Sequence, residues 1–175
     1  MNKQDIQSLL HSTYQHLADY VVSVDDHLWA QGPSGKWKAG QHIVHLSQST
    51  AAINKALSMP KFLLRYKFGK ANRPSRSYEE VIQRYQEKLA AADPSKTSPF
   101  SRNMPATDHT TKTKDLLELK LHTERLVKLV GRLSDKQLDK LLLPHPLMGR
   151  MTLREITMWN AYHAEHHEQV LRDKY

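Results

Sequence analysis

The 175-residue sequence contains no cysteine and only 6 glycines. Without cysteine the chain cannot form disulfide bonds, thiolate metal sites or a cysteine nucleophile. No stretch approaches the roughly 20 consecutive apolar residues of a membrane-spanning helix. Residues 1–17 also lack the uninterrupted apolar run of a signal peptide. We therefore expect a cytoplasmic protein with no membrane partner.

The overall composition is that of an ordinary globular chain. Hydrophobic residues make up 39% and charged residues 25% of the sequence, and this length suits one domain spanning residues 1–175. Most of the prolines lie between segments with helical periodicity. This distribution favours long helices joined by loops.

The formal net charge of +8 reflects an excess of basic residues. Much of that excess lies in residues 61–76, which contain no acidic residue; the basic ones are Lys61, Arg65, Lys67, Lys70, Arg73 and Arg76. The segment is interpreted as a solvated connection or as a loop that attracts an anionic substrate or cofactor. Because no nucleic-acid-binding motif is present, we expect no nucleic-acid partner.

Apolar residues recur at steps of three and four along most of the chain, which predicts amphipathic helices. The expected helices cover residues 3–30, 39–59, 77–92, 114–133, a short segment from 134 that ends before Pro144, and 152–175. Capping-box spacing marks three starts, at Ser77 with Glu80, Ser134 with Gln137 and Thr152 with Glu155. Residues 93–110 are predicted to form a long loop, and no alternating strand pattern appears. The predicted fold is all-α, a four-helix bundle with one short extra helix before the last long helix.

The last predicted helix carries three histidines within the stretch "NAYHAEHHEQV". At about 100° per residue, His163 and His167 lie within about 20° of Ile156, in the middle of the apolar stripe. His166 lies at its border, about 80° away. A spacing of four residues brings two imidazoles to one side of a helix, as in metal sites of the His-x3-His type.

A metal site would need a third ligand from another helix, because a single helix cannot surround an ion. The helix predicted at 39–59 offers His42 and His45. His42 lies closer to the apolar stripe of that helix and His45 lies at its edge. The periodicity alone does not choose between them.

Together these residues resemble the DinB/YfiT-like family of metal-binding helical proteins. Its members carry a tryptophan, then "HL" eight residues later, and a C-terminal helix with H-x3-H followed by Gln. Here the elements are Trp37, His45 with Leu46, and "HAEHHEQ" from His163 to Gln169. The approach "HPLMGRMTLREI", residues 145–156, also looks like the family's lead into its last helix.

The resemblance implies a four-helix bundle with a three-histidine site at one open end, filled by a divalent ion such as zinc or nickel. It selects His45, His163 and His167 as ligands. His42 and His166 are then expected to be neighbours at the rim or surface. A homodimer formed through a helix face is also expected.

Three functions follow from such a site. The first, which the resemblance implies, is a transferase that acts on a small electrophile with a low-molecular-weight thiol, and a small anionic thiol would suit the basic segment. The second is a hydrolase that uses metal-bound hydroxide, and the third is a non-catalytic metal-binding stress-response protein. A general base would help either enzyme, but the helical positions select none; Glu155 and Glu124 are open candidates.

Overall fold

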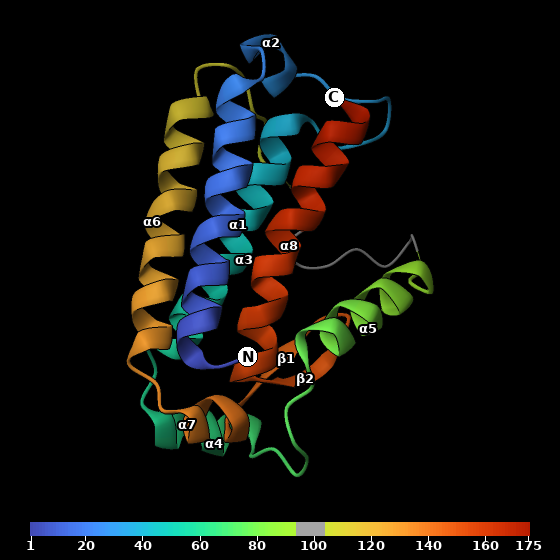
Figure 1. Ribbon diagram of the computed structural model, residues 1–175. Helices are drawn as coiled ribbons and strands as arrows, with labels where there is room; N and C mark the ends of the chain where they lie inside the picture. Colours follow the sequence, from blue (N-terminus) through green and yellow to red (C-terminus); the bar gives the residue numbers. More distant parts are fainter. Residues whose placement is uncertain (94–103) are drawn as a thin grey trace.

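The computed structural model describes residues 1–93 and 104–175, and helices dominate it. In chain order the elements are α1 (Lys3–Ser23), α2 (Asp26–Trp29), α3 (Ala39–Leu57), α4 (Lys61–Phe68), α5 (Tyr78–Ala90), α6 (Lys112–Gly131), α7 (Asp135–Lys140), β1 (Leu142–His145), β2 (Gly149–Thr152) and α8 (Leu153–Lys174). Figure 1 shows α1, α3, α6 and α8 running alongside one another. The predicted all-α four-helix bundle is confirmed.

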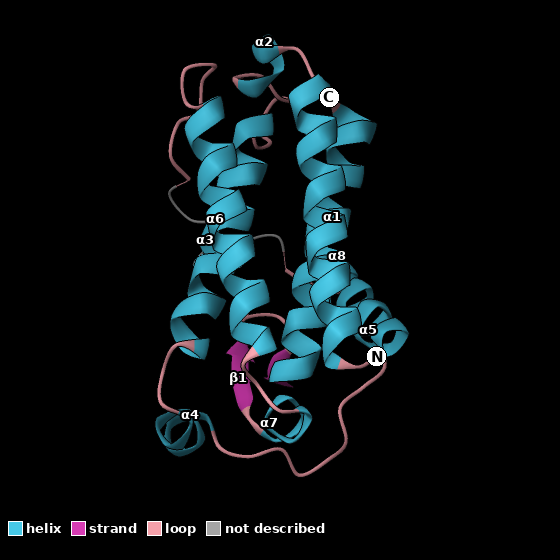
Figure 2. Ribbon diagram, turned by 60° about the vertical axis from the view of Figure 1, so that its left-hand side comes forward, coloured by secondary structure: helices cyan, strands magenta, loops and turns pink. Residues whose placement is uncertain are grey.

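The remaining elements lie around this bundle. Helix α5 leans against the outer side of α8, and α4, α7 and the β1–β2 hairpin gather at one end (Figures 1 and 2). The predicted helix at 77–92 is therefore a fifth long segment outside the bundle. Part of the predicted 93–110 loop, residues 94–103, lies outside the described residues, and residues 104–108 are irregular. None of the helices in the described ranges is both long and apolar enough to span a membrane.

Helix α1 shows how the apolar stripe forms the core and where it stops. Ile6, Leu10 and Leu17 are completely buried, as their spacing predicts. The helix nevertheless ends at Ser23 and not at residue 30, because Val24 adopts an extended conformation. The Asp25 side chain then accepts a hydrogen bond from the His27 backbone N–H and begins the one-turn helix α2.

All three predicted capping boxes form. In each, the hydroxyl of the N-cap residue accepts from a backbone N–H in the first turn, and the side chain three residues on accepts from the backbone N–H of the N-cap; the pairs are Ser77 with Glu80, Ser134 with Gln137 and Thr152 with Glu155. Each box satisfies two N–H groups that a helix start otherwise leaves unpaired. The sequence therefore located the starts of α5, α7 and α8 closely.

The sequence predicted no strands, and this prediction was wrong for one short hairpin. Residues 142–145 and 149–152 pair as an antiparallel hairpin in which Leu142 lies opposite Thr152 and His145 lies opposite Gly149. Gly149 has a φ of 74°, which favours glycine, and it closes the turn. Each strand is only four residues long and two adjacent leucines are both buried, so no period of two is visible.

The basic segment 61–76 is also not a simple loop. Its first half forms helix α4, which begins after Pro60 and ends where Gly69 has a φ of 86°. The Lys61 ammonium donates to the Leu57 carbonyl at 2.7 Å and so caps the end of α3. In its second half, Arg73 and Arg76 turn inward to one carboxylate, that of Glu155.

Glu155 anchors the start of α8 to the segment that precedes α5. Its side chain is fully buried and accepts hydrogen bonds from both Arg73 guanidinium NH2 groups, from the Arg76 guanidinium and backbone N–H, and from the Thr152 backbone N–H. Burial raises the pKa of this carboxyl, but the hydrogen bonds, led by those from Arg73, outweigh burial and hold the pKa below its ordinary value. The carboxylate is therefore ionised and fully engaged.

A second buried polar group connects the bundle helices. The Tyr14 hydroxyl of α1 lies 2.8 Å from the Thr50 hydroxyl of α3 and donates to the Asn160 carbonyl oxygen of α8 at 3.1 Å. All three side chains are buried. Because a slip of any one helix would leave these groups unpaired in the core, the contact fixes the three helices in register.

Replacing Glu155 by Gln is expected to lower the free energy of unfolding by about 3 kcal/mol, because it leaves two arginines beside a buried neutral amide. Urea unfolding at pH 7 measures the change. Glu124→Gln, on the exposed face of α6, is the matched control and is expected to change stability by less than about 0.5 kcal/mol. Equal effects of the two substitutions would contradict an anchoring role for Glu155.

Candidate metal centre

The histidine cluster lies between two antiparallel helices of the bundle. His45 comes from the second turn of α3, and His163 and His167 come from successive turns of α8. All three are buried, with 8%, 3% and 7% of their surfaces exposed, respectively. His166 is half-buried. The helical angles therefore separated the inward-facing pair correctly from His166.

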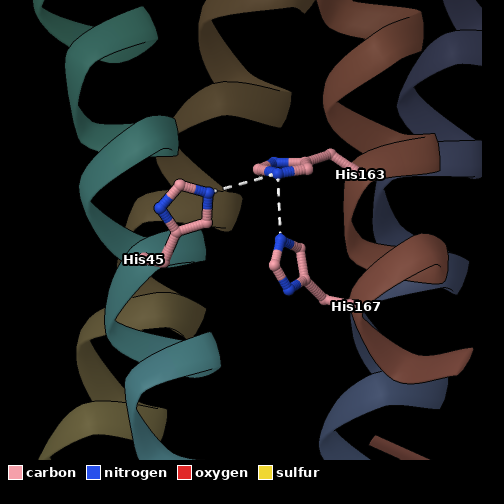
Figure 3. Close-up of side chains that lie close together, drawn as sticks. All are labelled: His45, His163 and His167. Carbon is pink, nitrogen blue, oxygen red and sulfur yellow. Dashed lines mark hydrogen bonds between the residues drawn. The ribbon is translucent and has the colours of Figure 1, made fainter. Parts of the chain in front are cut away.

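The three rings point toward one another (Figure 3). The His163 Nε2 atom lies 3.3 Å from His45 Nε2 and 3.1 Å from His167 Nε2. One nitrogen from each ring falls within 4.8 Å of the others. In a tetrahedral zinc site with Zn–N bonds of about 2.0–2.1 Å, neighbouring nitrogens are about 3.3 Å apart. The cluster therefore has the dimensions of a three-histidine metal site.

Burial keeps the imidazoles of His163 and His167 neutral. The pKa values of His163 and His167 lie well below 6.5, chiefly because burial disfavours the charged ring and secondarily because the other histidines are close. A metal binds the neutral form of imidazole, so little proton release opposes binding at pH 7. In the tautomers that direct all three lone pairs into the cluster, these lone pairs repel one another unless a cation lies between them. The donor set fits a divalent transition metal better than an empty core.

His42 does not lie at the rim, which corrects the sequence-based expectation. It is 7% exposed, and its Nδ1 is 2.8 Å from the Nδ1 of His167. Burial lowers the pKa of His42 to about 4, and the nearby His45 contributes in the same direction. Periodicity correctly placed His42 on the buried face, but the ring meets the side of His167 that faces away from the cluster.

Aromatic rings enclose the cluster. Trp37, in the loop before α3, has its ring centroid 4.9 Å from that of His45 and stacks nearly parallel to His167 at 6.1 Å. On the other side Trp159 stacks against His163 at 4.5 Å. Tyr85 of α5 approaches His163 at 6.3 Å. Tyr85 was missed by the sequence analysis, although it shares the buried stripe of α5 with Val81.

Neither carboxylate considered as a general base belongs to the cluster. Glu155 is committed to Arg73 and Arg76, and it precedes His163 by eight residues, about 12 Å along the helix. Glu124 lies on the exposed face of α6. The basic helix α4 follows the far end of α3, 12 residues and about 18 Å beyond His45. The basic segment therefore gives no structural support for an anionic thiol at the site.

A family model described as the DinB superfamily matches residues 9–171, nearly the whole chain. The chain belongs to the DinB superfamily. Searches of curated proteins and of solved structures find no significant match. The resemblance noted at Trp37, His45, His163 and His167 is thus supported by a match that extends across the bundle.

Within this DinB fold the cluster can hold an ion through neutral ligands alone. Three imidazoles occupy three positions of a tetrahedron and leave the fourth open, which is typical of catalytic zinc sites, whereas structural sites are closed. Among the described residues, no Asp, Glu or Cys joins the group of possible ligands. An ion held there would keep its full positive charge.

His45→Ala or His163→Ala is expected to abolish uptake of zinc or nickel by this DinB protein, because two imidazoles hold an ion far less tightly than three. Elemental analysis of untagged protein after reconstitution measures the stoichiometry. His166→Ala is the matched control, since this residue is adjacent to His167 in the sequence, and it is expected to retain nearly full uptake. Loss of uptake in the control alone would exclude this ligand set.

The metal-free protein is expected to lose stability as the pH falls from about 6.5 towards 4. The pKa values of His42 and His145 are lowered to about 4 by burial. As the pH falls, these two rings are therefore protonated in the unfolded chain at a higher pH than in the folded protein. Because of this difference, each of the two rings is expected to make the free energy of unfolding about 2 kcal/mol lower at pH 5 than at pH 7. Urea titrations at several pH values measure this slope.

His145→Gln provides the comparison. The His145 Nδ1 accepts from the backbone N–H groups of Leu147 and Met148, and the Gln side chain can replace that acceptor without titrating. The variant is expected to show a shallower slope, while His11→Gln, at an exposed position, keeps the original one. An unchanged slope in His145→Gln would refute the assignment.

Proposed function

We propose that this DinB superfamily protein is a metal-dependent enzyme in which His45, His163 and His167 bind a divalent ion, zinc or nickel. The proposed reaction is transfer of a low-molecular-weight thiol to a small electrophilic substrate. One observation carries the proposal: three buried imidazoles converge with nitrogens 3.1 and 3.3 Å apart, and no acidic ligand joins them among residues 1–93 and 104–175. Such a donor set leaves both charge and a coordination position available for chemistry.

When bound, the ion would act as a Lewis acid that lowers the pKa of a thiol or a water molecule at its open position. The absence of cysteine from the chain is relevant here. Because no protein thiol competes for the position, an external thiol can occupy it.

The protein's own residues would hold and shield this chemistry. Burial of the His163 and His167 rings keeps them unprotonated at neutral pH. Trp37 and Trp159 stack against the ligand rings and limit their rotation. The apolar and aromatic surroundings also keep bulk water from screening the charge at the site. Positioning and electrostatics, more than a dedicated general base, are the contributions that the chain can make.

A metal-dependent hydrolase is the second candidate. It uses the same three ligands and needs only water in place of the thiol, which an open position on three imidazoles also supports. A non-catalytic metal-binding protein of a stress response is the third. It would need metal affinity but no space for a substrate beside the ion.

The proposal extends to the protein's setting. We treat residues 1–175 as one domain that acts in the cytoplasm on a small-molecule substrate, with a homodimer as the expected assembly. The cytoplasmic assignment agrees with a cysteine-free chain and with a reduced thiol pool as the source of the second substrate. Analytical ultracentrifugation measures the assembly state directly.

Assays of metal-loaded and metal-stripped protein separate these functions. We expect conjugation of a low-molecular-weight thiol to a small aryl halide or epoxide, at a rate at least about tenfold above that of stripped protein. Little hydrolysis of activated esters or amides is expected in parallel assays. Hydrolysis without conjugation would favour the second function, and metal binding without turnover would favour the third.

Elemental analysis of gently purified, untagged protein tests the basis of all three functions. Binding of less than about a tenth of an equivalent of any transition metal after reconstitution would reject the metal site itself. Protein with His45→Ala, assayed beside His166→Ala, distinguishes turnover at this site from a contaminating activity.

A further inference from the structure

The two ring nitrogens of His167 face different partners. Its Nε2 points into the cluster, 3.1 Å from His163 Nε2, and its Nδ1 lies 2.8 Å from the Nδ1 of His42. Two Nδ1 atoms at that distance share one proton, so one ring is the donor and the other the acceptor. The tautomer of His167 therefore depends on which ring carries the proton.

The contacts of His42 continue on its other side. Its Nε2 lies 3.4 Å from the Tyr175 hydroxyl, and this hydroxyl donates to the backbone carbonyl of Trp37. His42 has no further hydrogen-bond partner within residues 1–93 and 104–175. Four groups are thus linked by consecutive hydrogen bonds, from the Trp37 carbonyl through Tyr175 and His42 to His167.

The Trp37 carbonyl sets the direction of donation along these hydrogen bonds, because a carbonyl can only accept. The single hydroxyl proton of Tyr175 is donated to the Trp37 carbonyl, so the Tyr175 oxygen presents a lone pair to His42. His42 then carries its proton on Nε2 and has a lone pair on Nδ1. That lone pair accepts from the Nδ1–H of His167, which leaves the Nε2 of His167 unprotonated and directed into the cluster.

We propose that His42 and Tyr175 are positioning residues that hold His167 in the tautomer able to bind a metal through Nε2. The proposal rests on the proposed metal site and adds how one of its ligands is prepared before the ion arrives. With the opposite direction of donation, a proton would occupy His167 Nε2 and block coordination. Hydrogen bonds from the remote nitrogen of a ligand histidine have this orienting effect in metal sites generally.

His163 provides an internal comparison. Its Nδ1 is buried and has no hydrogen-bond partner among the described residues, and its ring is held by stacking on Trp159. No described protein group therefore orients its remote nitrogen, Nδ1, in contrast to the Nδ1 of His167. The orientation of His167 thus depends on contacts that α3, α8, Tyr175 and the loop carrying Trp37 provide together.

The test combines nitrogen NMR of the metal-free protein with zinc affinity measured by competition against a chelator. In wild-type protein, ¹⁵N shifts are expected to show His167 protonated on Nδ1 and His42 protonated on Nε2. His42→Phe preserves a planar ring but removes the acceptor, and it is expected to weaken zinc binding about 10- to 100-fold. His42→Gln restores an acceptor and is expected to recover most of that loss.

Tyr175→Phe tests the direction of donation, because it removes the lone pair that selects the His42 tautomer. Metal-free Tyr175→Phe is expected to show a mixture of His167 tautomers and a smaller loss of affinity than His42→Phe. His166→Gln is the matched control, expected to remain within about twofold of wild type. Circular dichroism of each variant confirms that the bundle is intact.

The outcomes separate this proposal from the proposed metal site. If wild-type protein binds no zinc, the proposed function fails. The tautomers that NMR detects in metal-free protein still test the proposed roles of His42 and Tyr175. If zinc binds but His167 carries its proton on Nε2 in metal-free wild-type protein, the proposal that His42 and Tyr175 set the His167 tautomer is overturned. Wild-type affinity in His42→Phe, or an equal loss in His42→Gln and His42→Phe, would overturn it as well.

Discussion

Burial of imidazole rings between α3 and α8 is the constraint on which the rest of this structure depends. A buried ring must be neutral, and each of its nitrogens then needs a partner that water would otherwise provide. His45, His163 and His167 direct nitrogens at one another, an arrangement in which one cation can accept a lone pair from all three rings at once. The metal-binding hypothesis therefore arises from the cost of burying polar groups, in addition to the family membership.

The bundle bears this cost because its helices are held in register elsewhere. The contact between Tyr14, Thr50 and Asn160 lies one turn before His163 on α8 and links α8 to α1 and α3. At the start of α8, Glu155 ties the helix to Arg73 and Arg76. These two polar contacts lie on the same helix as two of the three candidate ligands. They explain how rings from distant parts of the chain meet within hydrogen-bonding distance.

Much of the architecture could be predicted because its signals are local. The stripe of Ile6, Leu10 and Leu17 and the capping boxes at Ser77, Ser134 and Thr152 depend on residues within a few positions of one another, and all appear as predicted. The break after Ser23 and the hairpin at 142–152 were missed because they depend on a single cap and on burial of adjacent leucines. The helical angles of α8 separated His163 and His167 from His166 for the same local reason.

The sequence by itself determined the helical class, the starts of several helices and the two histidines that face inward on α8, since periods of 3.6 residues are visible in one dimension. Only the tertiary structure decided that both histidines of α3 are used, His45 toward the cluster and His42 toward the far side of His167. It also decided that Glu155 is an anchor and that Tyr175 reaches the Trp37 carbonyl. These are contacts between segments up to 138 residues apart, and no local pattern encodes which atoms of two distant helices will face each other.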